Sequence, residues 1–514
     1  MKEYLFESNP IALSIQKNKE DITREDLVKF VKENNFTKIT FHYIGGDGKL
    51  KELKLPFSNT YQLENILTDG ERADACSLYK NAVDMGKSDV YIVPVYKTVF
   101  LNPFESNSID FICRYVDNEG NLASFAYDSI LNKAVNLFRE KTDYELYAAG
   151  ELEFFLLWDV ERNIYPIPEQ MGYHGSLPFT KAGGILSEIL YHIERITGTV
   201  KYAHSEVGNI ERLQSDNEEI KNKHMEQLEV EFLPAPIEDM ANYMILGKWL
   251  IRNIAYRHGC IATFTPKLEE GIAGNALHFH LMIKDKDDNN LLVDENGDYT
   301  EISRKLIGGL IEYADSLTSF GNTVASSYFR LVPNQEAPTH ICWSESNRSA
   351  MIRVPLGWSK ISNLTKIINP QQKIILDRKK DKKQTIEFRP PDGSAFIHLL
   401  LAGITMAAEY GLSNTENFKE VEELHVTGNI FQDEKRRKNL KTLPVSCKES
   451  SEILAQKRHL YERGKIFPAF IIDYIIRILQ EENDGDLRIS LNNLSSEERT
   501  ICLRKILHKD VHSR

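Results

Sequence analysis

Ionisable side chains recur two residues apart in four segments that otherwise have the composition of apolar strands. In a strand, residues i and i+2 point to the same face, so each pair would share one face of a sheet. A single strand of this kind is explained by a solvated face, but four of them beside bulky apolar neighbours indicate a charged sheet face. The four segments are GELEFFLLW (Glu151, Glu153), EQLEVEFL (Glu229, Glu231), LHFHLMI (His278, His280) and TIEFRPPD (Glu387, Arg389).

Carboxylates clustered on such a face repel one another unless cations lie between them. Carboxylate oxygens with an occasional imidazole suit Mg²⁺ or Mn²⁺ better than zinc. Arginine binds planar carboxylates and phosphates in a bidentate manner, and several arginines occur in the same part of the chain. A carboxylate metal site beside arginines is typical of metal-assisted phosphoryl transfer. The arginines are Arg330, Arg348, Arg353 and Arg389, and no GxxxxGK[ST] loop accompanies them.

Length and charge exclude several other classes of protein. The chain has 514 residues. A single hydrophobic core is not usual in a chain of this length, so we expect at least two domains. Its 63 basic and 75 acidic residues give a net charge of −12, which argues against nucleic-acid binding and against docking on an anionic membrane. Its six cysteines are scattered, and the sequence has neither a signal-peptide core nor a membrane-spanning run. We therefore expect a cytoplasmic protein with reduced thiols.

The hydrophobic patterns predict an α+β protein in two parts. Residues 1–105 predict a small N-terminal domain, with a helix over 21–33 and a β-hairpin around the glycines of 45–48. Residues 106–514 predict a larger catalytic domain in which apolar strands alternate with amphipathic helices, and residues 207–226 and 415–441 read as polar, irregular segments. The predicted helices cover 186–196, 237–258, 302–317, 394–411, 450–463, 467–481 and 496–508, the first two stopped by Gly198 and Gly259.

Seven ordered motifs resemble the glutamine synthetase family over roughly residues 25–455. The resemblance implies an N-terminal β-grasp domain followed by a catalytic domain with a curved antiparallel sheet and surrounding helices, which agrees with the two parts above. The motifs are AGELEFF, HSEV, EQLEVEF, LHFH, SYFRLVPNQEAP, SNRSAMIRVP and IEFRPPD.

The resemblance also implies two or more divalent cations, Mg²⁺ or Mn²⁺, bound in the catalytic domain. All six positions that match the family's metal ligands carry suitable side chains. One cation would be held by Glu153, Glu206 and Glu229, and the second by Glu151, His278 and Glu387.

ATP is the nucleotide substrate that the resemblance implies. Arg348 and Arg353 would bind its phosphates, His204 would lie near the transferred group, and His280 would lie near the nucleotide. Met282 stands where the family usually has a serine that contacts the nucleotide, so these contacts would differ in detail.

Glutamate would be held by Arg330, Arg389 and the backbone at Gly274. Ala273 replaces an asparagine that the family uses in this loop, which alters the expected geometry around the substrate. Glu336 matches the family's flap glutamate, which shields the reaction intermediate and helps to bind ammonium.

The segment RADACSLYKNAVDMGKSD resembles the family's ammonium-binding turn. On this alignment Asp74 and Ser77 bind ammonium, with Tyr173 near the same site. A competing match, LTDGER, would place Asp69 there instead, but its distance along the chain to Ser88 fits the family less well.

The activity implied is the ATP-dependent ligation of ammonia to the γ-carboxylate of L-glutamate through γ-glutamyl phosphate. The first alternative is a γ-glutamyl-amine ligase that uses an organic amine, and the second is a non-catalytic relative that senses ligands or builds an assembly. Complete metal ligands argue against the non-catalytic relative, and the pair Asp74 and Ser77 favours ammonia. The family also implies a homo-oligomer, a dodecamer of two stacked rings with active sites between subunits.

Overall fold

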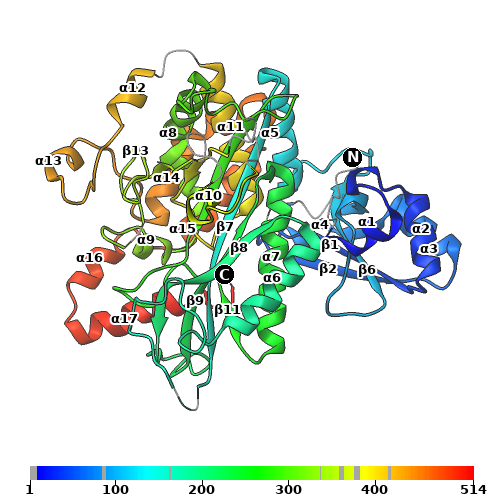
Figure 1. Cartoon of the computed structure of the whole chain (residues 1–514), viewed down its shortest axis with the longest axis horizontal. Coiled ribbons are helices and arrows are strands. Elements are labelled where there is room, and N and C mark those ends of the chain that lie inside the picture. The colour runs from blue at the N-terminus through cyan, green and yellow to red at the C-terminus, as the bar shows by residue number, and fades with distance from the viewer. Residues whose placement is uncertain are drawn as a thin grey trace.

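The computed structural model of the chain describes residues 8–80, 82–83, 88–160, 162, 164–335, 337–357, 364–374, 383–414 and 418–513. Two β-sheets with helices packed around them make a mixed α+β fold, which confirms the predicted fold class. In Figure 1 the N-terminal elements, coloured blue, lie on the right, and β7 of the larger sheet crosses the centre. Among the residues described, no helix has both the length and the apolar character needed to span a bilayer.

The first sheet has six strands in the order β2-β1-β6-β4-β3, with β5 beside β6. Its β1 and β2 form the antiparallel hairpin that the sequence predicts, with Ile44 opposite Leu50. The strand β6 pairs with both β1 and β4, so this sheet extends past residue 105, where we expected the first domain to end. The elements of this part are α1 (Pro10–Ile15), α2 (Arg24–Glu33), β1 (Lys38–Ile44), β2 (Leu50–Pro56), α3 (Thr60–Asp69), β3 (Glu71–Asp74), α4 (Ala75–Leu78), β4 (Asp89–Pro94), β5 (Phe100–Leu101) and β6 (Ser108–Val116).

The second sheet has nine strands in the order β13-β14-β15-β12-β7-β9-β8, with β10 and β11 beside β7. Neighbours in this order are antiparallel, except that β13 and β14 are parallel. The four segments with paired ionisable residues form β15, β12, β7 and β9, which are consecutive in the sheet. The strands are β7 (Glu145–Trp158), β8 (Val200–Ile210), β9 (His224–Phe232), β10 (Ala235–Pro236), β11 (Ile261–Thr263), β12 (Leu277–Lys284), β13 (Trp343–Glu345), β14 (Ile352–Val354) and β15 (Ile386–Phe388).

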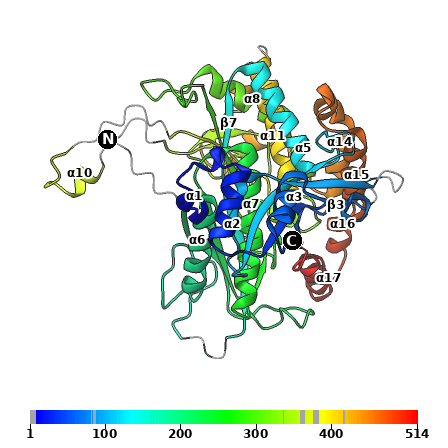
Figure 2. The ribbon, with the colours of Figure 1, turned by 90° about the vertical axis from the view of Figure 1, so that its right-hand side faces the viewer.

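Helices cover the apolar face of the second sheet and join it to the first. The helix α7 contacts both β2 and β7, so it lies between the two sheets, and Figure 2 shows it behind the N-terminal elements. All seven helices predicted beyond residue 106 are present, and Gly198 and Gly259 adopt the expected left-handed conformation after α6 and α7. The helices are α5 (Tyr127–Thr142), α6 (Gly183–Thr197), α7 (Ile237–Arg257), α8 (Glu301–Gly321), α9 (Ser327–Arg330), α10 (Thr365–Ile368), α11 (Ile397–Ser413), α12 (Phe418–Glu423), α13 (Glu434–Arg437), α14 (Cys447–Glu462), α15 (Ala469–Glu481), α16 (Leu487–Asn492) and α17 (Ser496–His508).

The prediction of a polar excursion over residues 207–226 is wrong in part. The strand β8 continues to Ile210 and β9 begins at His224, so both ends of the segment belong to the sheet. Between them, Leu213 and Ile220 are buried in a small apolar cluster with Met225. These apolar residues are too sparse among polar neighbours to give a periodic signal.

Two glycines allow α8 and α11 to approach closely. A Cβ at Gly309 would collide with the carbonyl oxygen of Ala407, and a Cβ at Gly411 would collide with that of Lys305. After α8, the Asn322 side chain donates to the carbonyl oxygen of Pro390 at 2.8 Å, just before α11. This helix pair therefore sets where the segment after α8 meets the segment before α11.

We expect Gly309→Ala to destabilise the protein by about 1–3 kcal/mol, because the new methyl group overpacks the α8–α11 contact. The thermal unfolding midpoint of the variant should fall relative to that of the parent protein. Gly184→Ala in α6 is the matched control, since a Cβ there meets no atom within 4 Å and should leave the midpoint unchanged or slightly raised. Equal midpoints for Gly309→Ala and the parent would contradict this account of the helix contact.

Candidate active site

A cavity of about 720 Å³ opens on the charged face of the second sheet. Its walls come from β7, β8, β9, β12, β14 and β15, and from the loops around residues 273–276 and 330–335. Most side chains predicted for the site line it. They are Glu151, Glu153, Tyr173, His204, Glu206, Glu229, Gly274, His278, His280, Arg330, Arg348, Arg353, Glu387 and Arg389.

The register of the sheet sets charged residues opposite one another across the strands. On β7, Glu153 lies opposite Glu229 of β9, which in turn lies opposite His204 of β8. One pleat further along the same face, Glu151 lies between His278 of β12 and Glu231 of β9. Because the side-chain period is two, the apolar residues between them point to the opposite face, against the helices.

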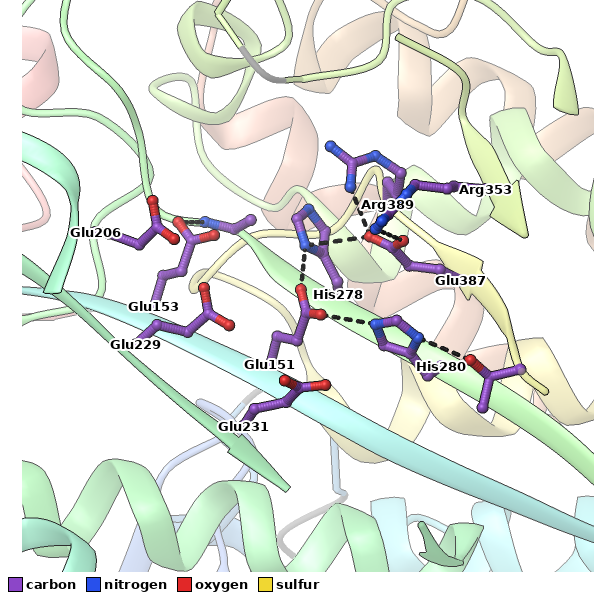
Figure 3. Close-up of polar contacts among 12 residues, drawn as sticks. Glu151, Glu153, Glu206, Glu229, Glu231, His278, His280, Arg353, Glu387 and Arg389 are labelled. Carbon is purple, nitrogen blue, oxygen red and sulfur yellow. Dashed lines mark hydrogen bonds and ion pairs between the residues drawn. The ribbon is translucent and has the colours of Figure 1, made fainter. Parts of the chain in front are cut away.

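A second row continues across β12, β15 and β14. His280 lies opposite Glu387, which lies opposite Arg353. The carboxylate of Glu387 accepts hydrogen bonds from Arg353 Nη1 at 2.7 Å and from Arg389 Nη1 at 2.5 Å. Figure 3 shows this carboxylate between the two guanidinium groups.

Glu151, His278 and Glu387 place one ligand atom each within 4.8 Å of one another. His278 Nδ1 lies 2.7 Å from Glu151 Oε2 and 3.6 Å from Glu387 Oε1. Both contacts are drawn as dashed lines in Figure 3. Burial and the nearby Arg389 lower the pKa of His278 to about 4, so its imidazole is neutral at pH 7. A neutral imidazole is the form that binds a metal ion. Two carboxylates and this imidazole therefore fit a divalent cation.

Glu153, Glu206 and Glu229 gather on the other side of His278 (Figure 3). Glu206 and Glu229 lie within 4.8 Å of each other and of His204, measured between ligand atoms. Glu153 accepts hydrogen bonds from two neutral donors, the side chain of Gln227 and the backbone N–H of Ala276, both at 2.9 Å. The ligand atoms that lie within 4.8 Å of one another are thus those of His204, Glu206 and Glu229, and Glu153 adjoins them by facing Glu229 across the strands. Neighbouring buried carboxylates need positive charge to ionise together, so this group also fits a cation.

Carboxyl pKa values shift in opposite directions at the two ends of the cavity, raised for Glu153 and Glu229 and lowered for Glu151 and Glu387. Burial, together with the neighbouring Glu206, raises the pKa of Glu153 to about 8. Burial and the surrounding carboxylates raise the pKa of Glu229 in the same way. Burial also acts to raise the pKa of Glu151, but His280 and His278 outweigh it and hold that pKa well below its usual range. On the Glu153 side, Arg330 acts to lower the pKa of Glu153 but does not outweigh burial and Glu206, whereas on the Glu151 side the histidines outweigh burial.

Two predicted substrate contacts occupy tightly packed positions. Arg330 is buried, and its Nη1 donates to the carbonyl oxygen of Pro390 at 2.8 Å. Gly274 lies against the backbone of Pro266, so a Cβ there would collide with the Pro266 carbonyl oxygen. Only glycine fits at this position, and its backbone faces the cavity.

Aromatic rings gather at the side of the cavity near Glu206. The ring of Tyr173 stacks on that of His174 with a centroid distance of 4.3 Å and meets His204 edge-on at 5.4 Å. Tyr173 is about half exposed, so it lies at the rim rather than in the interior.

The predicted ammonium-binding pair lies elsewhere. Asp74 caps the N-terminus of α4, where its Oδ1 accepts a hydrogen bond from the Cys76 N–H at 2.9 Å and its Oδ2 accepts one from the Ser77 hydroxyl at 2.5 Å. The hydrogen bond from Ser77 is the main reason that the pKa of Asp74 is lowered. Both residues are exposed, and neither lines the cavity of its own chain. Glu336 lies outside the described residues.

Sequence reasoning gave no role to several polar residues of the cavity. Lys201 lines it, and its Nζ lies 2.6 Å from Glu231 Oε1. The pairing of β8 with β9 is irregular between Val200 and Tyr202, and such a bulge, which redirects a side chain, leaves no mark in the hydrophobic pattern. Gln227 shares a face of β9 with Glu229 and Glu231, so the two-residue period could have identified it.

The family model described as "Glutamine synthetase, catalytic domain" matches residues 128–490, most of the chain. The chain belongs to the glutamine synthetase family. A glutamine synthetase of Pyrococcus furiosus is 30% identical over 455 residues, which cover 86% of this chain and 90% of the relative. A glutamine synthetase of Sulfolobus acidocaldarius is 26% identical over 488 residues, covering 89% and 94% respectively.

Solved structures support the same fold. A cryo-EM structure of Plasmodium falciparum glutamine synthetase matches with a TM-score of 0.70 at 17% identity, covering 93% of this chain and 98% of that one. A structure described as a GmaS/ADP complex matches with a TM-score of 0.68 at 16% identity. At these identities the likeness to the glutamine synthetase fold is one of architecture.

The raised pKa of Glu153 makes the stability of the metal-free protein pH-dependent. An unfolded glutamate titrates near 4.5 and the folded one near 8, so the folded state binds more protons between these values. The free energy of unfolding should therefore fall as pH rises from about 4.5 to about 8. Glu153→Gln should flatten this slope, raise the thermal midpoint in EDTA at pH 8, and reduce the stabilisation by added Mg²⁺.

All three effects are measured by thermal unfolding across this pH range, in one series with EDTA and in a second series with added Mg²⁺ and no EDTA. Glu33→Gln, on the exposed surface of α2, is the control and should keep the parent's slope and its response to Mg²⁺. An unchanged slope in Glu153→Gln would show that Glu153 is not the titrating group.

Proposed function

We propose that this protein is a glutamine synthetase that ligates ammonia to the γ-carboxylate of L-glutamate at the expense of ATP. The observation that carries the proposal is the cavity on the second sheet. Buried carboxylates and a neutral imidazole from neighbouring strands converge there beside three arginines, Arg330, Arg353 and Arg389. This set of side chains suits a reaction in which negative charge gathers on a transferred phosphoryl group.

Two divalent cations, Mg²⁺ or Mn²⁺, would be held by the two groups described above. Glu151, His278 and Glu387 would hold one, and Glu153, Glu206 and Glu229 the other. When bound, the cations neutralise phosphate oxygens and the carboxylates around them. The raised pKa values of Glu153 and Glu229 support the second assignment, because these groups need positive charge in order to ionise.

The other cavity residues would bind and orient the substrates. Arg330, Arg389 and the backbone of Gly274 would hold glutamate. Arg348 and Arg353 would bind the phosphates of ATP, with His204 and His280 nearby. The glutamate γ-carboxylate then attacks the γ-phosphorus, the bond to ADP breaks, and γ-glutamyl phosphate forms. Glu336 would cover this acyl phosphate, because water would hydrolyse it.

Ammonium would bind at Asp74 and Ser77, with Tyr173 beside them. The ammonium ion has no lone pair, so it must lose a proton before its nitrogen can attack the acyl carbon and displace phosphate. The carboxylate of Asp74 is ionised at neutral pH, as a proton acceptor requires, and the hydrogen bond from Ser77 lowers its pKa further.

Asp74 and Ser77 can serve the reaction only if they reach the cavity of another chain. Both are exposed and lie outside the cavity of their own chain, whereas Tyr173 is half exposed at its rim. This arrangement supports a homo-oligomer with active sites shared between neighbouring subunits, and the resemblance to the family implies a dodecamer of two stacked rings. A closed ring satisfies such head-to-tail contacts in every subunit.

The acceptor amine is tested by measuring phosphate release with glutamate, ATP and Mg²⁺. We expect release to depend on ammonium and on glutamate, with glutamine as the product. Parallel reactions contain ethanolamine, putrescine or no amine. Faster turnover with an organic amine than with ammonium would identify a γ-glutamyl-amine ligase instead. Glutamate-independent release in every reaction would contradict the proposed chemistry.

Shared sites predict complementation between two inactive variants. Asp74→Asn should lower glutamine synthesis by about 10²–10⁴-fold, because an amide accepts no proton at neutral pH. Glu229→Ala should abolish turnover by removing a cation ligand. After dissociation and co-assembly, the mixture should recover partial activity, because some interfaces pair two intact halves.

Sedimentation of each assembly shows whether the variants remain oligomeric. Asp69→Asn is the control for the N-terminal alignment and should keep the parent's activity. No recovery in mixed assemblies, or a monomer that makes glutamine, would contradict the shared site.

A further inference from the structure

Lys267 is a buried lysine that the mechanism above does not use. Only 1% of its surface is exposed, and it lies in the loop that connects β11 to β12 along one wall of the cavity. Its Nζ donates hydrogen bonds to the carbonyl oxygen of Ile272 and to the side-chain oxygen of Gln335. A single ammonium group thus joins two segments that are far apart in sequence.

Both partners border the proposed glutamate site. Ile272 precedes Gly274 by two residues, and a Cβ at Gly274 would lie 3.2 Å from both Lys267 Cδ and Arg330 Cγ. Gln335 lines the cavity and directly precedes Glu336 in the sequence. Lys267 therefore lies behind the loop that would hold glutamate, and it links this loop to the segment leading to Glu336.

The C-terminal helix fixes the outer side of the same loop. His508 Nε2 lies 2.9 Å from the carbonyl oxygen of Leu268, and Arg504 Nε donates to Glu269 at 3.0 Å. Arg499 makes a bidentate contact with Glu270, at 2.5 and 2.6 Å. Residues 268–270 are thus held from outside by α17, whereas Lys267 reaches inward.

A lysine is costly at such a position. Burial, with Arg330 nearby, lowers the pKa of Lys267 to about 7. An apolar side chain of similar length would fill the space without this penalty. What the lysine adds is an ammonium group with three donors, which can bind one backbone oxygen and one side-chain oxygen at the same time.

We propose that Lys267 is a positioning residue that couples the glutamate-binding loop around Gly274 to the segment ending at Gln335. It acts through its hydrogen bonds to Ile272 and Gln335. This role rests on the proposed function: a correctly held loop binds glutamate, and a correctly held segment 331–335 keeps water from the acyl phosphate.

The test compares Lys267→Met with the parent enzyme, after the parent has been shown to release phosphate in the presence of glutamate, ATP, Mg²⁺ and ammonium. Methionine keeps the length of the side chain but has no donor. We expect the KM for glutamate to rise about tenfold while the KM for ATP changes less than about twofold, which is the pattern of a lost ground-state contact with one substrate. Phosphate released per glutamine formed should also rise, as water reaches the intermediate.

Hydrogen exchange of the ligand-free protein gives a readout that needs no activity. Peptides covering 268–275 and 331–335 should exchange faster in Lys267→Met, while peptides of the first sheet should not. Lys509→Met is the matched control, since it removes an ion pair with Glu482 in the C-terminal region and should change neither exchange in these peptides nor either KM. Gln335→Leu removes the same contact from the other side and should reproduce the split between the two KM values.

Four results would separate the possibilities. If the parent shows no glutamate-dependent activity but both peptides exchange faster in Lys267→Met than in the parent, the coupling is supported and the proposed function is refuted. Unchanged exchange in Lys267→Met and in Gln335→Leu would overturn the coupling. Equal increases in both KM values, or a lowered thermal midpoint with both KM values unchanged, would also overturn it by showing a purely structural lysine.

Discussion

Repulsion between buried carboxylates is the constraint on which the rest of the structure depends. The register of β7 and β9 places Glu151 opposite Glu231 and Glu153 opposite Glu229, and like charges directly opposite each other destabilise a sheet. The opposite face of the same strands offsets this destabilisation. There Leu152, Phe154, Leu228 and Val230 are fully or almost fully buried, and α6 and α7 cover the sheet. The apolar face thus offsets the cost of the charged one.

On the charged face itself, the positive charge that offsets the carboxylates is unevenly distributed. Glu387 is paired with two arginines, and Glu151 is hydrogen-bonded to the neutral His278 and to His280, whose pKa Glu151 helps to raise, so the carboxylates at this end of the cavity have positive partners. Around Glu153 the hydrogen-bond donors are neutral, and Arg330 does not outweigh burial and the charge of Glu206. The carboxylates at one end of the cavity are therefore held ionised by the protein itself, whereas Glu153 at the other end needs further positive charge in order to ionise at neutral pH.

The sequence predicted the charged sheet because its signal is local. Ionisable residues two apart, each between apolar neighbours, define one face of a strand without any knowledge of the partner strands, and four such strands proved to be consecutive. The same period separates a carboxylate of the site from a structural one on the same strand. Glu226, three residues before Glu229, faces the other way and caps α6 by accepting hydrogen bonds from the N–H groups of Lys181 and Ala182.

Other features could not be predicted because they depend on contacts between distant segments. Lys267 shows no periodicity, and its partners lie 5 and 68 residues away. The strand β6 pairs in parallel with β1. A hairpin pattern in the sequence predicts antiparallel pairing of successive strands and therefore cannot predict this pair. Lys201 enters the cavity through an irregularity in strand pairing, and such irregularities are decided by the fold around them.

The position of α17 has a consequence for biosynthesis. Domains fold in the order in which the ribosome releases them, and most of the second sheet can form while the chain is still growing. The loop of residues 265–270, however, receives its outer contacts from Arg499, Arg504 and His508, near the end of the chain. This loop therefore gains its outer contacts only after residues 499–508 have been synthesised, so most of the second sheet can be folded on a nascent chain before the loop beside the cavity is fixed.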